Sequence, residues 1–380
     1  MYKLLDEVRI LDLTRLLPGP YATLLLADLG AHVIKIEDPK EGDPVRALSP
    51  RYRDGTSYLF HLLHRNKASV ALNLKSQIGR EILLKLAQTA DVLIEGFRPG
   101  VTARLGIEYA AVRAVKPDII YCSVTGYGQD GPYSEHVGHD LNYISLAGIL
   151  GLTGREEPVI PGVPIADLIG GALAAFYIVA ALQRRARTGA GAYIDLSLTD
   201  AALSLMTLHW ADYVGAHRDL KRGQLPLGGY YACYAVYKTK DGRFLSLACL
   251  EPKFWQAFCE RVQRPEWVGR PFDPSLKAEV QRLIETRSLE EWLSVLDPKQ
   301  VPITPVYEEL REIWNDPHLR RRRLWVEGLE QLAAPARLAE VRIEGDRLAP
   351  ALGQQTEEVL RELGIAPDAI ARWRAEGVIA

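Results

Sequence analysis

The sequence predicts an α/β protein with a Rossmann-like, doubly wound large domain and a smaller α+β domain. Three observations support this. Apolar runs alternate with helical patterns through the first 200 residues, the pattern becomes aromatic and β-branched near residue 218, and 380 residues are enough for two hydrophobic cores. Parallel strands need long crossover connections, which helices supply, so the alternation favours a parallel sheet.

The large domain is expected to begin with a strand, a turn and a helix. Residues 8–13 form a short apolar run, and Pro18-Gly19-Pro20 interrupts it. Residues 21–29 have a helical pattern and residues 31–36 form a second apolar run, which together indicate a βαβ unit. The remaining elements expected in this domain are strands at 69–74, 91–94 and 118–125 and helices at 78–88 and 102–115.

A hairpin is expected to open the small domain. Residues 230–239 and 243–249 are rich in aromatic and β-branched side chains, and Lys240-Asp241-Gly242 between them is a turn sequence. The other expected elements are helices at 254–262 and 276–284, a proline-flanked strand at 301–306, and helices at 356–364 and 368–376. The expected limits are 1–217 for the large domain, 218–325 for the small domain and 326–380 for a C-terminal segment that returns to the large domain.

The composition is that of an ordinary globular protein. Hydrophobic residues make up 48% and charged residues 25% of the chain, and the formal net charge is -2. So small a charge gives no overall attraction to nucleic acid or to anionic lipid, and neither is expected as a partner. The one dense basic run, Arg320 to Arg323, has no interleaved aromatic residues and is interpreted as a solvated helix end.

Other features predict a soluble cytoplasmic protein with reduced cysteines. The first residues contain no apolar stretch of signal-peptide length, and the longest apolar run, 165–182, is interrupted by Asp167 and by glycines. The cysteines lack Cys-x-x-Cys spacing, so buried thiols are expected rather than a metal site or disulfides. They are Cys122, Cys233, Cys249 and Cys259.

One glycine motif suggests a dinucleotide site that its context does not support. Gly126-Tyr127-Gly128-Gln129-Asp130-Gly131 has the Gly-x-Gly-x-x-Gly spacing and follows an expected strand. Pro132 comes next, and no helical pattern follows it, so there is no helix N-terminus to bind a pyrophosphate. We therefore do not expect a nicotinamide cofactor.

His139 and Asp167 are the candidate catalytic residues. His139 lies between Gly138 and Asp140, and Asp167 begins a long apolar helix after Pro164. An imidazole and a carboxylate that face each other can act as acid and base and pass a proton across one carbon. Each residue also has a purely structural interpretation, Asp167 as the N-cap of its helix and His139 as a packed or surface side chain.

Several motifs together resemble those of the family III CoA-transferase and racemase superfamily, over essentially the whole chain. In chain order they are Leu16-Leu17-Pro18-Gly19-Pro20, the run from Asp28 to Glu37, Phe97-Arg98-Pro99-Gly100, Gly126-Tyr127-Gly128-Gln129 and Gly131-Pro132. Within this superfamily, the run from Gly138 to Tyr143 and the pair Glu251-Pro252 make the chain most similar to the α-methylacyl-CoA racemases.

The resemblance implies a homodimer of two interlocked chains. In such enzymes the active site lies between the large domain of one subunit and the small domain of the other, so His139 and Asp167 would be completed by the partner subunit's Glu251. Taken alone, Glu251 would be the first-turn acid of a helix. No metal and no cofactor are expected beyond the coenzyme A of the acyl-CoA thioester substrate.

The implied activity is that of an α-methylacyl-CoA racemase in lipid metabolism. His139 would remove a proton from one face of the substrate and Asp167 would return one to the other, interconverting the 2R and 2S epimers through an enolate. Glu251 would orient the imidazole. The alternative is a family III CoA-transferase with Asp167 as nucleophile, which needs no base at His139. A third alternative is an acyl-CoA-binding protein without catalysis.

The resemblance also implies a set of coenzyme A contacts. They are Leu72, Asn73, Leu74, Lys75, Gly96, Phe97, Arg98, Arg104, Gly138, Asp140, Leu141, Asn142 and Tyr143. Related racemases can have a basic phosphate contact just after the second strand, where this chain has Glu37-Asp38. Either Lys35, Lys40 or Arg46 replaces that contact, or the 3′-phosphate is held less firmly.

Overall fold

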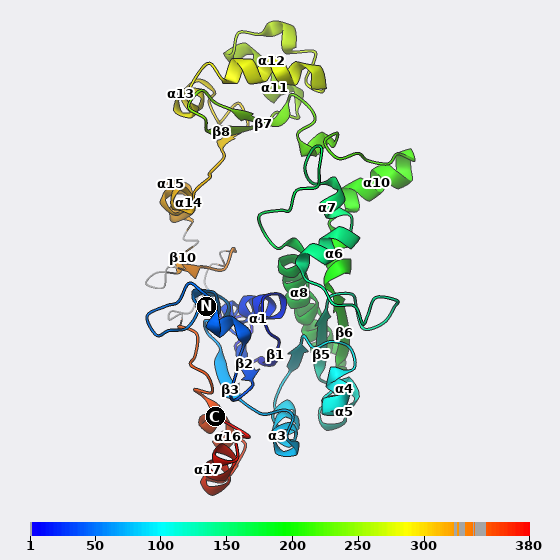
Figure 1. The fold of residues 1–380 in the computed structure, drawn as a ribbon, viewed down its shortest axis with the longest axis vertical. Coiled ribbons are helices and arrows are strands. Elements are labelled where there is room, and N and C mark those ends of the chain that lie inside the picture. Colours follow the sequence, from blue (N-terminus) through cyan, green and yellow to red (C-terminus); the bar gives the residue numbers. More distant parts are fainter. Residues whose placement is uncertain (1, 323–324, 327–330, 337, 339–346) are drawn as a thin grey trace. The chain divides into compact units, whose positions relative to one another are not determined.

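The computed structural model describes residues 2–322, 325–326, 331–336, 338 and 347–380 (Figure 1). Within them the chain forms two compact units. The first unit consists of the described parts of residues 1–147, 162–206 and 324–380, and the second consists of residues 148–161 and the described part of 207–323.

The first unit is built on a six-stranded parallel sheet with the strand order β3-β2-β1-β4-β5-β6. The strands are β1 (Arg9–Leu13), β2 (His32–Glu37), β3 (Ala68–Ala71), β4 (Val92–Glu95), β5 (Ile120–Thr125) and β6 (Ala192–Ser197). The strand order reverses beside β1, where Ile10 is paired with both Val33 and Val92. This is the doubly wound arrangement, and it confirms the predicted α/β class.

Helices cover both faces of this sheet, as a parallel sheet requires. One hydrophobic core contains Leu11, Ile34 and Leu93 from the strands and extends to Leu360 and Ile370 of the two C-terminal helices. These helices are α16 (Thr356–Glu362) and α17 (Pro367–Ala375), and α3 (Gln77–Ala87) and α5 (Tyr109–Val115) also contribute to this core. The other helices of this unit are α1 (Pro18–Asp28), α2 (Tyr58–His64), α4 (Val101–Leu105), α6 (Asp140–Leu146), α8 (Ile165–Thr188) and α9 (Leu198–Ser204), with a 3₁₀ turn η1 (Pro44–Ala47) and a two-stranded ribbon of β10 (Trp325–Val326) and β11 (Gln331–Leu332).

Two helix predictions were wrong in their limits. Helix α1 begins at Pro18, whereas a break was expected through Pro20; the first residues of a helix have no intrahelical acceptor for their amides, so proline is tolerated there. The single helix expected over 102–115 is two helices, α4 and α5. They are separated at Gly106, which adopts a left-handed conformation with φ 67° and ends α4.

Helix α8 is 24 residues long with a hydropathy of 2.1, and by length and composition alone it is apolar enough to cross a membrane. In the structure it packs within the first unit, against α1, α9, β5 and β6. A Cβ atom at Gly171 would lie 2.4 Å from the carbonyl oxygen of Pro18, and one at Gly170 would lie 2.3 Å from the Leu198 side chain. These glycines therefore allow α8 to approach its neighbours closely.

The second unit contains the predicted hairpin and a small antiparallel sheet. The sheet consists of β7 (Tyr234–Lys238), β8 (Phe244–Ala248) and β9 (Ile303–Pro305), in that order. Trp255, Phe258 and Trp292 fill its core. Its helices are α7 (Ile149–Leu152), α10 (Thr207–Ala216), α11 (Pro252–Arg261), α12 (Lys277–Ile284), α13 (Leu289–Val295), α14 (Leu310–Asn315) and α15 (Pro317–Arg321), with 3₁₀ turns η2 (Pro226–Gly228), η3 (Pro265–Trp267) and η4 (Pro274–Leu276).

Two other features of the sequence can be compared with the structure. All four cysteines are buried free thiols, as predicted. Burial raises the thiol pKa of Cys233 to about 11 and that of Cys249 to about 12. Arg320 and Arg321 end α15, in agreement with a helix end, whereas Arg323 lies outside the described residues.

The division into units differs from the expected boundary at residue 217. It falls after residue 206, and residues 148–161 group with the second unit. Arg222 holds the two segments of the second unit together, because its guanidinium donates hydrogen bonds to the carbonyl oxygens of Gly151 (2.8 Å) and Glu156 (3.1 Å). Apolar patterning along the chain contains no signal for such a contact.

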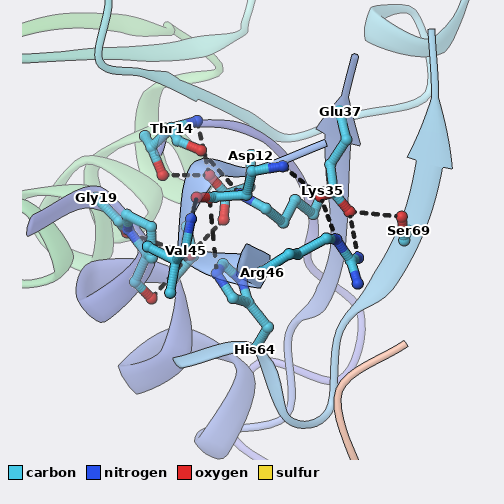
Figure 2. A network of polar contacts seen from close by, with 12 residues as sticks. Asp12, Thr14, Gly19, Lys35, Glu37, Val45, Arg46, His64 and Ser69 are labelled. Atoms are coloured by element: carbon cyan, nitrogen blue, oxygen red, sulfur yellow. Dashed lines mark hydrogen bonds and ion pairs between the residues drawn. The ribbon is translucent and has the colours of Figure 1, made fainter. Parts of the chain in front are cut away.

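A buried network of charged side chains lies at the carboxyl ends of β1 and β2 (Figure 2). Asp12 is fully buried, accepts hydrogen bonds from the Thr14 amide (2.9 Å) and the Thr23 hydroxyl (2.6 Å), and pairs with Lys67 (3.3 Å). Burial alone would raise the pKa of Asp12, but Lys67 and Lys35, together with the hydroxyls of Thr14 and Thr23, lower it. The carboxylate therefore stays ionised inside the protein.

The second part of the network surrounds Lys35 (Figure 2). Its buried ammonium group pairs with Asp43 (2.8 Å) and donates a hydrogen bond to the carbonyl oxygen of Thr14 (2.9 Å). Beside it, Glu37 accepts two hydrogen bonds from Arg46 (2.8 and 2.7 Å) and one from Ser69 (2.7 Å). These contacts fix the backbone where the strands end.

Removing the charge of Lys35 should destabilise the fold. In Lys35→Met, Asp43 loses its buried cation, and we expect the free energy of unfolding to fall by about 3–5 kcal/mol in urea denaturation. The matched control is Lys40→Met, because Lys40 is exposed and should change stability by less than about 0.5 kcal/mol. Equal, small effects of the two substitutions would contradict the structural role of the buried pair.

Candidate active site

Two cavities open at the carboxyl ends of the parallel strands of the first unit. The large cavity, of about 750 Å³, is lined by the segments that follow β1, β4 and β5, by Ser134, by residues 136–139, and by Asn142 and Tyr143. The small cavity, of about 500 Å³, is lined by the segments that follow β1, β2, β3 and β4. Arg15, Phe97 and Arg98 line both cavities. In doubly wound sheets ligands bind at this end of the strands, where the strand order reverses, and here that point lies between β1 and β4.

The structure brings His139 and Asp167 together, because both line the large cavity. His139 is the N-cap residue of α6, and its amide donates a hydrogen bond to the side-chain oxygen of Asn142 (3.0 Å). The Tyr143 hydroxyl donates one to the carbonyl oxygen of Gly138 (2.6 Å). Both bonds lie within or beside the first turn of α6, so the backbone of His139 is well fixed.

Asp167 lies three residues into α8, and the N-cap position belongs to Pro164. The structural interpretation of Asp167 as an N-cap is therefore not what the structure shows. Its carboxylate lines the large cavity near the positive end of the α8 dipole, which stabilises negative charge.

Asp140 connects the two candidate catalytic residues. It follows His139 in the chain, and its carboxylate accepts a hydrogen bond from the backbone amide of Asp167 (3.2 Å). Burial and, to a smaller extent, the negative charge of Asp140 raise the pKa of Asp167 to about 6, and His139 offsets part of the increase. Asp167 is thus mostly ionised at pH 7 yet more basic than an ordinary aspartate.

Glu251 belongs to the second unit, where it is exposed and occupies the N-cap position of α11. The structure describes one chain, so the expected contribution of the partner subunit's Glu251 to the site stays a prediction. Among the three candidate catalytic residues, the structure relates only His139 and Asp167 to each other.

Most of the expected coenzyme A contacts line one of the two cavities. The large cavity includes Gly96, Gly138, Asn142 and Tyr143, the small cavity includes Leu72, Asn73, Leu74 and Lys75, and both include Phe97 and Arg98. Arg104, Asp140 and Leu141 line neither of these two cavities. The carboxylate of Asp140 instead contacts the amide of Asp167.

The structure also limits which basic residue is available to a phosphate near β2. Lys35 is buried and paired with Asp43, and Arg46 is paired with Glu37 and donates to the carbonyl oxygen of Pro350 (3.1 Å). Of the three residues considered from the sequence, Lys40 is the exposed one.

Sequence reasoning missed Glu95, the last residue of β4. Its buried carboxylate accepts a hydrogen bond from the amide of Phe97 (2.7 Å), which borders both cavities. Burial, with a smaller contribution from the charge of Asp195, raises the pKa of Glu95 to about 7. The sequence signal that could have identified Glu95 is an acidic residue at the end of an expected strand, directly before Gly96-Phe97-Arg98.

The glycine motif at 126–131 has a packing role. A Cβ atom at Gly126 would lie 2.5 Å from the ring of Tyr143, so glycine allows that ring to lie against the loop. The next helix, α6, begins only at Asp140, which agrees with the expectation that no helix follows the motif. The motif shapes the wall of the large cavity, which Gly126 and Tyr127 line.

Comparison with known proteins decides the family. The family model described as CoA-transferase family III matches residues 5–356. The chain belongs to CoA-transferase family III. This confirms the resemblance drawn from the motifs, and it makes this family III protein an enzyme of the CoA-transferase and racemase superfamily.

Relatives of this family III protein include both transferases and a racemase. Succinyl-CoA:glutarate CoA-transferase of Mus musculus is 34% identical, over 99% of this chain and 90% of its own length. Alpha-methylacyl-CoA racemase of Homo sapiens is 30% identical, over 99% of this chain and 97% of its own length. A CaiB/BaiF family protein from Brucella suis has a crystal structure with a TM-score of 0.85 and 29% identity, covering 96% of this chain and 100% of that one.

The influence of Asp140 on Asp167 can be measured directly. Asp140→Asn keeps an oxygen that can accept the amide hydrogen bond but removes the negative charge, so the pKa of Asp167 should fall below about 6. A carboxyl-carbon NMR titration would report it. The exposed Asp130→Asn should leave the midpoint unchanged. An unchanged midpoint in Asp140→Asn would show that burial alone sets this pKa.

Proposed function

We propose that this family III protein is a CoA-transferase that moves coenzyme A from an acyl-CoA thioester to a carboxylic acid through Asp167. The observation that carries the proposal is the position of Asp167, an ionised and unusually basic carboxylate at the start of α8 in the large cavity. The comparisons support this reaction over the racemase preferred from the sequence, because two mammalian succinyl-CoA:glutarate CoA-transferases are 34% and 33% identical and the racemase is 30% identical.

The reaction follows from a carboxylate nucleophile. Asp167 attacks the thioester carbonyl carbon and the carbon–sulfur bond breaks. The CoA thiolate departs, and a mixed anhydride of the donor acyl group and Asp167 is formed. The thiolate then attacks the acyl carbon of Asp167, which releases the donor acid and forms an Asp167–CoA thioester. An acceptor carboxylate attacks this thioester and displaces the thiolate again. Attack of the thiolate on the acceptor carbonyl completes the product and restores Asp167.

The enzyme's oligomeric state, its cellular location and its binding of coenzyme A are part of the same proposal. By likeness to the family we propose an interlocked homodimer, with the partner subunit's Glu251 near His139 and Asp167, acting in the cytoplasm. Coenzyme A would enter as part of the substrate, with no separate cofactor, and the expected coenzyme A contacts would bind it across the two cavities.

A labelling experiment tests the role of Asp167. With succinyl-CoA as donor and glutarate labelled with oxygen-18 in its carboxylates, each transfer should leave one labelled oxygen on Asp167, because the acceptor oxygen becomes the anhydride bridge. Mass spectrometry of the peptide that contains Asp167 would detect it. Asp167→Asn should lose about 10³-fold or more in turnover. Transfer without labelling of Asp167 would rule out this mechanism.

His139 supports a second candidate function, the α-methylacyl-CoA racemase. The structure brings its imidazole and the Asp167 carboxylate to the same cavity, as proton exchange on two faces of a carbon requires. Incubation of a 2-methylacyl-CoA in deuterated buffer separates the two functions. A racemase would incorporate deuterium at the α-carbon with loss of optical purity, and His139→Ala would lower that rate by about 10²-fold or more. A transferase would show neither exchange nor a comparable dependence of transfer on His139.

A further inference from the structure

The exposed Arg15 has no anionic partner among the described residues, whereas buried and half-buried cations nearby are paired. Lys35 and Arg46 have partners in the buried network, and Arg65 pairs with Asp28. Among the described residues, the one contact of the Arg15 guanidinium is with the ring of Phe97, whose centroid is 5.6 Å away. Arg15 is exposed and lines both cavities, so it is accessible to a ligand there.

The turn that carries Arg15 is held rigidly. The amide of Thr14 donates a hydrogen bond to Asp12 (2.9 Å), and its carbonyl oxygen accepts one from Lys35 (2.9 Å), both within the buried network of Figure 2. A Cβ atom at Gly19 would lie 2.3 Å from the Thr14 side chain, so the start of α1 is packed tightly on the turn. The backbone leading to Arg15 is therefore fixed before any ligand binds.

The same turn contains backbone strain. Leu16, which follows Arg15, has φ 67°, in the left-handed region that a leucine rarely adopts. Such strain persists only where the surrounding structure enforces it, and it is concentrated at sites that bind or react. Here the constraint comes from the network on one side of the turn and from α1 on the other, and its effect is to place Arg15 at the junction of the two cavities.

We propose that Arg15 binds the second carboxylate of a dicarboxylate acceptor whose first carboxylate reacts at Asp167. This inference rests on the proposed transferase function and names its substrate class. Arginine forms paired, charge-assisted hydrogen bonds with carboxylates, and a cation in the same cavity as Asp167 balances a charge that a monocarboxylate lacks. The other arginine of the large cavity, Arg98, is one of the expected coenzyme A contacts, which leaves Arg15 for the acceptor.

The test compares two acceptors of equal chain length, glutarate and pentanoate, with butyryl-CoA as a donor that has no free carboxylate. Wild-type enzyme should prefer glutarate. Arg15→Met should raise the KM for glutarate about tenfold or more, while the KM values for pentanoate and butyryl-CoA stay within about twofold. Arg15→Lys should be intermediate, because lysine keeps the charge but not the paired geometry. The matched control, Arg53→Met, removes an exposed arginine outside both cavities and should change none of these values.

Each other outcome overturns the inference. An equal rise in KM for glutarate and pentanoate would mean that Arg15 does not bind the second carboxylate. A rise confined to butyryl-CoA would make Arg15 a contact of the coenzyme A phosphates. A wild-type enzyme that transfers equally well to both acceptors would exclude recognition of a dicarboxylate. Absence of transfer by wild-type enzyme to any acceptor would overturn the proposed function itself, and this is seen before any variant is compared.

Discussion

The arrangement of the candidate site depends on the interactions of the buried ammonium group of Lys35. This group joins β2 to the turn after β1, because its partners are Asp43 and the carbonyl oxygen of Thr14. A buried cation is strongly unfavourable without such partners, so the turn is fixed by electrostatics rather than by apolar packing. The effect extends further, since α1 starts from this turn and packs against Gly171 of α8, the helix that carries the candidate nucleophile.

Much of the fold could be predicted from hydrophobic periodicity. The strands buried on both faces are continuous apolar runs, so β1, β2, β4 and β5 were expected close to where they lie. Strand β6 was not predicted because Ala192–Ser197 is not a continuous apolar run: the exposed Tyr193 and Asp195 alternate with half-buried apolar residues. Residues 148–161 group with the second unit and accept hydrogen bonds from Arg222, and contacts between polar groups distant in the sequence leave no periodic signal.

The candidate site was predictable as a set of residue types but not as an electrostatic arrangement. Motifs identified His139 and Asp167, and the structure places both at one cavity. The sequence did not show that Asp140 contacts the amide of Asp167. Nor did it show that Lys35 is paired while Arg15 has no anionic partner in the described part of the chain, because charge neutralisation depends on which side chains the fold brings together. Motifs also failed to separate the two reactions, since one fold of this family supports both.

The raised pKa of Asp167 gives the site a thermodynamic cost. An aspartate has a pKa near 3.8 in the unfolded chain, and burial raises it to about 6 in the folded protein, so the folded state holds its proton more tightly. By linkage, the contribution of this group to folding is greatest below pH about 4 and declines as the pH rises through about 6. At neutral pH the ionisation of Asp167 therefore favours the unfolded chain, and the rest of the protein must compensate for it. The burial that causes this cost also makes the carboxylate more basic, which is useful for attack on a thioester.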